Sequence, residues 1–241
     1  MLALALTLAA HAGERSAPAP IPLLVDPFVG DSPARLAGGA DAAWQDDTNV
    51  GARASVEGAI ASRVAARVSM GLPVAGDVET DLGGEARVLL TPHDFGVDGA
   101  VGVRYKKVGF EGVENEIEGF VALAHQAGKN RFVVNGVAGR GVEEGEELEG
   151  TDSGNGDGLH YEDEVESDAE LAASWSLRVT EHAAVGAVAQ GRWSERHSDA
   201  TVGPTIGVET GGLSAVALIG GTNVEEAGWG VRSALIVQLA L

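Results

Sequence analysis

The chain of 241 residues contains no cysteine. A disulfide framework, a thiolate metal site and a thiol nucleophile are therefore all excluded. Basic residues are also scarce, with 16 Lys and Arg against 36 Asp and Glu and a formal net charge of −20. Because binding to nucleic acid requires Lys and Arg to displace counterions from phosphates, no nucleic-acid partner is expected.

Long apolar runs are missing too. No run of about 18 apolar residues follows the first segment, so no transmembrane helix is expected. Aromatic residues make up only 5%, whereas Gly, with 35 residues, has about twice its usual share. The length suits one large all-β domain or two smaller ones, and any insertion into a membrane must use strands.

The N-terminus differs from the rest of the chain. Residues 1–12, MLALALTLAAHA, form a short apolar run that ends in a small-x-small triplet, although no basic residue precedes it. This pattern is typical of a signal peptide. Residues 13–33 are Pro-rich and without periodicity, which predicts an extended tether, and the remaining residues, 34–241, are predicted to form one domain.

Apolar and polar side chains alternate along most of the chain. In residues 165–179, Leu171 and Trp175 share a face with five other apolar side chains, whereas acidic side chains lie opposite. The last stretch, 228–241, alternates in the same way up to its final residue. A period of two is typical of strands with one apolar face. We find about eleven such segments of roughly 9 to 11 residues, long enough to cross a bilayer on a tilt.

Every second connection between these segments is long or acidic. The longest covers 142–163, whereas others are tight turns such as Thr210-Gly211-Gly212. Chain ends on one side of a barrel require an even number of strands, and the Gly-rich segment 35–44 supplies the missing one. Twelve strands are therefore expected, with ten as the nearest alternative. Tryptophans 44, 193 and 229 then fall where strands meet long connections, at an interface that suits an indole ring.

In these features the chain resembles the porin-like, bacterial outer-membrane β-barrel proteins, from about Arg35 to Leu241. The resemblance implies an all-β fold, a closed antiparallel transmembrane β-barrel, in the outer membrane of a Gram-negative type bacterium. Residues 13–33 would be a periplasmic tether, outer-membrane lipid would surround the barrel, and the barrel-assembly machinery would read its last strand. No motif identifies a subfamily.

Three features depart from the family or its regular strands. Members typically end on an aromatic residue, where this chain has Leu241, and the chain has too few aromatic residues for two full girdles. Pro204 lies within a predicted strand and predicts a bulge.

A secreted soluble β-sandwich is the alternative fold, but sandwich strands usually run about 5 to 6 residues. The longer alternation in 165–179 favours the barrel.

No catalytic signature occurs, so the chain is not expected to be an enzyme. The most enzyme-like cluster, Ser194, Glu195, His197, Ser198 and Asp199, lies in one predicted outer loop, where a solvated loop is the simpler interpretation. The long connection contains an incomplete calcium-loop pattern, with Ser153 in place of its first Asp. A Ca²⁺ site there would use Asp152, Asn155, Asp157 and Glu164, and no other cofactor is expected.

The polar faces of the strands define the candidate site. Ten charged side chains are expected to line the lumen: Arg53, Arg67, Arg104, Lys106, Glu166, Asp168, Glu170, Arg178, Arg192 and Arg232. The charges predict either a narrow, water-filled channel or binding site for small polar solutes, or a structural or surface-interaction barrel whose lumen is plugged by ion pairs. In the channel interpretation, the acidic mouth favours cations.

Overall fold

The computed structural model describes residues 34–44, 48–76, 80–90, 97–108, 115–143, 164–194, 198–224 and 228–241. These residues form twelve strands: β1 (Ala34–Trp44), β2 (Thr48–Ala61), β3 (Val64–Ala75), β4 (Asp81–Leu89), β5 (Val97–Val108), β6 (Asn115–Ala127), β7 (Asn130–Glu143), β8 (Glu164–Arg178), β9 (Ala183–Ser194), β10 (Ser198–Thr210), β11 (Leu213–Val224) and β12 (Gly228–Ala240). The predicted signal peptide and tether lie outside the described residues.

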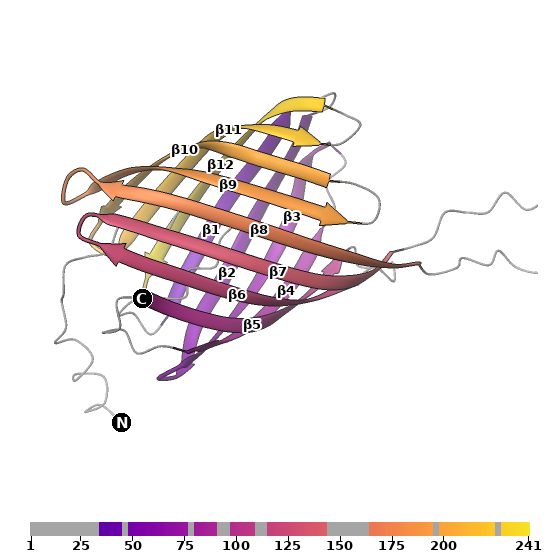
Figure 1. Cartoon of the computed structure of the whole chain (residues 1–241), viewed down its shortest axis with the longest axis horizontal. Helices are drawn as coiled ribbons and strands as arrows, with labels where there is room; N and C mark the ends of the chain where they lie inside the picture. Colours follow the sequence, from indigo (N-terminus) through magenta and orange to yellow (C-terminus); the bar gives the residue numbers. More distant parts are fainter. Residues whose placement is uncertain are drawn as a thin grey trace, which may run out of the picture.

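The sheet closes on itself. Each strand pairs antiparallel with its neighbours in the chain, and β1 also pairs with β12, which completes the barrel (Figure 1). The closed antiparallel barrel predicted from the alternation is confirmed, with twelve strands rather than ten. Within the described part of the chain, no helix has the length and hydropathy of a membrane span.

The outer surface of the barrel is apolar. On β12, Trp229, Val231 and Leu235 are 73%, 47% and 49% exposed, whereas Ala234 and Ile236, on the opposite face, are buried. The other strands repeat this pattern, so large apolar side chains are exposed over the whole circumference. A protein surrounded by water would bury such a surface, so this surface faces lipid. The soluble sandwich is therefore wrong.

The connections alternate between the two ends of the barrel. We call the end at which β1 begins and β12 ends the inner end, and the opposite end the outer end. The end of β7 and the start of β8, which the connection 144–163 joins, are at the outer end, and the two-residue turns 62–63, 128–129 and 211–212 lie at the inner end. Gly211 and Gly212 have φ of 55° and 86°, which a tight hairpin requires and which other residues rarely adopt.

Tryptophan side chains mark the membrane boundaries. Trp44, Trp193 and Trp229 lie at outer strand ends and are exposed, as the sequence predicts. Near the inner end, Trp175 pairs across the strands with Phe132 and donates its indole N–H to Asn130 Oδ1 at 2.9 Å. Indole rings with a polar partner are typical of the membrane–water interface.

Pro204 does not produce the predicted bulge. Val202 pairs with Gly221 and Thr205 pairs with Leu218, so β10 and β11 keep one register on both sides of the proline. The ladder skips two positions without an extra residue, because the neighbouring pairs hold the two strands in place. The register shifts lie between β2 and β3 in the part of the barrel that the structure describes.

Candidate functional site

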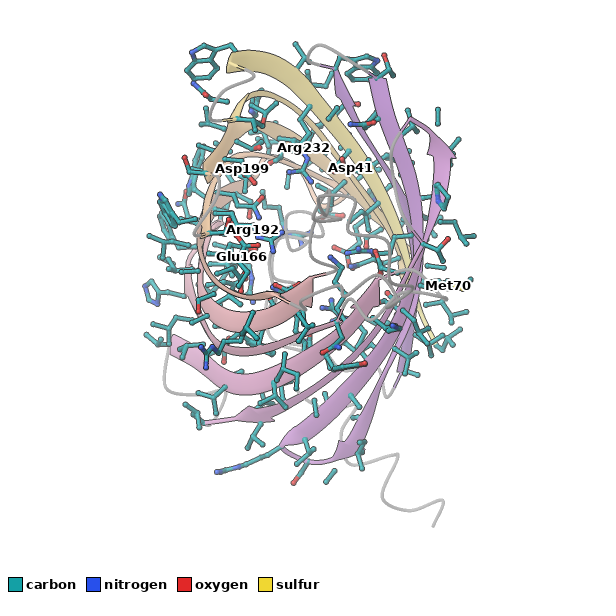
Figure 2. All side chains as sticks on the ribbon, turned by 90° about the vertical axis from the view of Figure 1, so that its right-hand side faces the viewer. Asp41, Met70, Glu166, Arg192, Asp199 and Arg232 are labelled. Atoms are coloured by element: carbon teal, nitrogen blue, oxygen red, sulfur yellow. The ribbon has the colours of Figure 1, made fainter. Side chains whose placement is uncertain are left out.

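All ten predicted lumen residues lie on the inner face of the barrel. They occupy the strand positions that alternate with the exposed apolar side chains. In Figure 2, Arg192 on β9 and Arg232 on β12 point into the interior, whereas Met70 on β3 lies on the outside. The direction of these side chains follows from the pleat of the strands, since successive residues point to opposite faces.

Ion pairs join β2, β3 and β4, mostly in the inner halves of these strands. The Arg87 guanidinium donates to Glu57 Oε1 at 2.8 Å and to Glu85 Oε1 at 3.1 Å, and only 3% of its side chain is exposed. Arg67 donates to the other carboxylate oxygen of Glu85. Four charged side chains on three strands thus form one network.

A second network covers the inner face of β5, β6, β8 and β9 towards the outer end. Arg104 donates two hydrogen bonds to Glu118 and lies 3.9 Å from Glu170. Arg192 Nη2 lies 3.2 Å from Glu116 Oε1 and 3.5 Å from Asp168 Oδ2. The predicted acidic and basic patches are thus paired with each other here, which agrees with the ion-pair interpretation for this part of the lumen.

Three carboxylates of the second network lie close together. Glu116, Glu118 and Asp168 each place an oxygen within 4.8 Å of the others, an arrangement that could hold a metal ion. Arg192 contacts two of these carboxylates, and Lys106 Nζ lies 3.9 Å from Glu116. Arg104 donates to Glu118, so each of the three carboxylates has a cationic partner.

Two further predicted lumen residues, Arg178 and Glu166, lie near opposite ends of the barrel. Arg178 donates to Glu209 Oε2 at 3.2 Å and to the carbonyl oxygen of Glu181 at 2.8 Å, which ties the turn 179–182 to β10 at the inner end. Glu166 lies near the outer end of β8, half-buried, where it pairs across the ladder with Gly141.

Two other predicted clusters lie partly or wholly outside the described residues. Asp152, Asn155, Asp157 and the side chain of Glu164 are outside, so the calcium site stays a prediction. Glu195 and His197 are also outside. Of the enzyme-like cluster, Asp199 lies opposite Arg192 in the β9–β10 ladder and Ser194 lies opposite Asp168 in the β8–β9 ladder. These two side chains therefore adjoin the second ion-pair network.

One half of the inner face is closed by apolar side chains. Eight of them form one buried cluster on β6 to β9, β11 and β12: Ala124, Val133, Ala172, Val188, Val216, Leu218, Ala234 and Ile236. Polar side chains nearby are also buried, and Thr201 Oγ1 donates to Thr222 Oγ1 at 3.1 Å. Water has little access to the part of the lumen that these buried side chains fill.

The other half contains a cavity of about 340 Å³ along β1, β2 and β3. Arg35 and Gln238 line it near the inner end, and Ala43 and Asn49 line it near the outer end. The cavity therefore follows nearly the whole length of β1. It is displaced from the barrel axis towards this wall.

Cations are the exposed partners of several ion pairs that face the cavity or the outer part of the lumen. Side-chain exposure is 51% for Arg53 and 13% for Asp81, 26% for Arg67 and 4% for Glu85, and 27% for Arg104 and 5% for Glu118. All three arginines line the cavity. Of their carboxylate partners, Asp81 also lines the cavity, whereas Glu85 and Glu118 do not, so a solute there meets more guanidinium groups than carboxylates. Arg232 is the exception, since its partner Asp41 is more exposed.

Sequence reasoning missed three acidic partners in these pairs. Asp41 lies 3.0 Å from Arg232, and Asp81 lies 2.6 Å from Arg53. Asp41 belongs to the Gly-rich first strand, and neither Asp81 nor Glu85 is among the ten lumen residues that the sequence predicts. The even spacing of Asp81, Glu85 and Arg87, four and two residues apart, is the signal that could have placed them together on one face.

Comparisons with known proteins agree on the fold. Neither a scan against protein families nor a search of curated proteins found a match. Among solved structures, the chain resembles the KdgM porin with a TM-score of 0.58 and 9% identity, covering 85% of this chain and 99% of that one. The NanC porin gives 0.60 and 9%, covering 86% and 100%. An outer membrane channel from Pseudomonas putida F1 gives 0.62 and 11%, covering 87% and 96%.

These similarities establish the architecture. The chain has the fold of bacterial outer-membrane β-barrels, and its apolar outer surface agrees with a place in that membrane, as the sequence predicts. At identities of 9% and 11%, the subfamily is not identified.

Proposed function

We propose that this barrel is a narrow, porin-like channel for small polar solutes, with its path along the wall formed by β1, β2 and β3. The observation that carries the proposal is the cavity, whose lining extends from Arg35 near the inner end to Ala43 near the outer end. The apolar cluster on the opposite half leaves this wall as the wet part of the lumen.

The size of the cavity limits the solute. Binding pockets for small molecules typically measure about 300 to 1,000 Å³, so about 340 Å³ suits a solute at the small end of that range. The KdgM porin has been solved in complex with disordered oligogalacturonate, which supports a polar saccharide or a solute of similar polarity.

The exposed guanidinium groups bear on charge selectivity. The acidic outer connections favour cations at the mouth, as expected from the sequence. Inside the cavity, however, Arg53, Arg67 and Arg104 are more exposed than their carboxylate partners. Because low-dielectric walls focus the field where a passage is narrow, we propose that the arginines control permeation and favour anionic solutes.

Single-channel conductance in a planar bilayer tests the path. Ser55 lines the cavity, whereas the next residue towards the outer end, Ala54, shares the lipid-facing side of β2. We expect Ser55→Trp to lower the conductance several-fold and the matched Ala54→Trp to leave it unchanged, since only the first side chain occupies the path. Equal conductance in both variants would contradict this route.

The reversal potential in a KCl gradient tests the charge preference. We expect an anion-selective wild type and a shift towards cations in Arg53→Gln, because the most exposed guanidinium is lost. A cation-selective wild type would instead assign control to the acidic mouth. A folded barrel without measurable conductance would favour the alternative, a structural or surface-interaction barrel whose lumen is plugged by ion pairs. The paired charges on β5, β6, β8 and β9 support that alternative.

A further inference from the structure

The lipid-facing side of the barrel carries very little charge. Among the described strand residues that point outwards, no Asp or Glu occurs, and Lys107 and Arg140 are the only Lys and Arg. Lys107 follows Val103 and Tyr105 on the outward side of β5, and Arg140 shares its side of β7 with Val134. Two cations among so many apolar positions require an explanation.

Both cations lie at the same end of neighbouring strands. Lys107 is one residue from the outer end of β5, and Arg140 is three residues from the outer end of β7. Between them, β6 places Asn115 opposite Lys107 and Ile117 opposite Arg140. The three strands lie side by side in the lower front wall of the barrel (Figure 1). Since β5 and β7 are about 10 Å apart, long side chains from both can reach one headgroup.

The depth of Lys107 and Arg140 in the membrane also fits contact with a lipid headgroup. A cation on the lipid face is costly at the centre of the bilayer and nearly free of cost at its interface. The ends of β5 and β7 lie at the end of the barrel where Trp44, Trp193 and Trp229 mark the interface. Arg140 is exposed and Lys107 is half-buried, so the guanidinium is directly accessible from the membrane.

The surface towards the bilayer centre is shallow and apolar. Gly119 on β6 pairs with Ala138 on β7, and Gly136 on β7 pairs with Val121 on β6. A Cβ added to either glycine would meet no atom within 4 Å. Exposed Ile117 and Val121 flank this surface. A depression with apolar sides next to two cations has the shape and the charge of a site for an anionic amphiphile.

We propose that Lys107, Arg140 and the depression at Gly119 and Gly136 bind a phosphate-bearing lipid of the outer leaflet. The phosphate groups contact the two cations, and an acyl chain lies along the depression. Charge complementarity selects this occupant, because Lys107 and Arg140 are cations on a surface whose described outward-pointing strand residues include no Asp or Glu. These two side chains are the part of the described lipid-facing surface that attracts an anionic headgroup. The proposal is independent of the channel function.

Native mass spectrometry of the refolded full chain in detergent tests this site. The probes are a bisphosphorylated glucosamine lipid and, as a neutral comparison, phosphatidylcholine. We expect selective retention of the phosphorylated lipid and about 30-fold weaker binding in the variant Lys107→Gln with Arg140→Gln, because each cation near an anionic lipid surface contributes about 1 kcal/mol. Lys129→Gln, in an exposed turn at the inner end, is the matched control and keeps the wild-type affinity.

Three results would overturn the lipid site. Unchanged affinity in the double variant overturns the site, as does equal competition by inorganic phosphate, which would indicate a free-anion site. If the double variant fails to refold, Arg140→Gln alone is expected to weaken binding about 5-fold, and no change there overturns the site as well. Conductance is expected to stay at the wild-type level in every variant, so failure of this site is distinguishable from failure of the channel.

Discussion

Arg87 shows how a single buried cation holds the wall together. It is 3% exposed and contacts Glu57 and Glu85, so its removal leaves two buried carboxylates without this partner. We expect Arg87→Met to lower the free energy of unfolding by about 3 to 5 kcal/mol, the usual cost of breaking a buried pair. Tryptophan fluorescence during urea unfolding in lipid vesicles measures the effect.

Arg63 supplies the control for this prediction. It lies in an exposed turn at the inner end, and Arg63→Met is expected to leave stability unchanged. Adding Glu57→Gln to Arg87→Met should recover part of the lost free energy of unfolding. One of the two carboxylates left without Arg87 is then replaced by a neutral amide. A loss below about 1 kcal/mol for Arg87→Met would show that water, rather than Arg87, compensates these carboxylates.

At the scale of single residues, the sequence predicts which face of a strand a charged side chain occupies better than it predicts the ion-pair partner of that side chain. The period of two predicts one face for the ten lumen residues, and in the structure all ten alternate with exposed apolar side chains, because the pleat of a strand fixes alternation locally. The partner of each charge depends on the register between strands. Asp81 pairs with Arg53 across β3, a contact that no local pattern in either segment encodes.

At the scale of elements, β10 and β11 approach closely at Gly203 and Gly220. A Cβ on Gly203 would lie 2.5 Å from the Gly220 Cα and 2.5 Å from the Ile219 carbonyl oxygen. Because these are backbone atoms, the strands must shift, and we expect Gly203→Ala to cost about 1 to 3 kcal/mol. Gly84→Ala is the control, since nothing lies within 4 Å of its added Cβ. Equal unfolding midpoints for the two variants would contradict a close contact here.

The strands themselves were predictable, whereas their irregularities were not. Alternation and the spacing of turns predicted twelve strands, including the Gly-rich β1, because strand parity requires a partner for β12. The expected bulge at Pro204 was wrong. A proline removes one donor, but it does not add a residue, and neighbouring pairs of β9, β10 and β11 hold the register.

At the scale of the whole molecule, closure of the sheet has a measurable result. Every strand has two partners, so no edge is available for detergent or heat to open one strand at a time. On a detergent gel we expect the unboiled, refolded chain to migrate faster than the boiled chain. Identical mobility of the two samples would mean that the barrel does not close in solution.

The barrel was predictable as a whole, but the off-centre cavity was not. The cavity depends on which side chains share one height of the lumen, and this follows from the register around all twelve strands. Small side chains on β1 leave space, whereas Val133, Val188 and Leu218 fill the opposite half. Knowing which residues face the lumen does not show where small side chains leave space and where large ones fill it.

Because the cavity is off-centre, contact with the solute and stability of the fold depend mainly on different strands. A solute touches mainly a ribbon of adjacent strands at the N-terminal end of the barrel, while the apolar cluster that stabilises the fold belongs to later strands. Substitutions at cavity-lining positions of β1 to β3 outside the Arg87 network can therefore change which solute is accepted at little cost to folding. For protein engineering, these positions are the ones to diversify, whereas the Arg87 network and the rest of the barrel are a scaffold to keep.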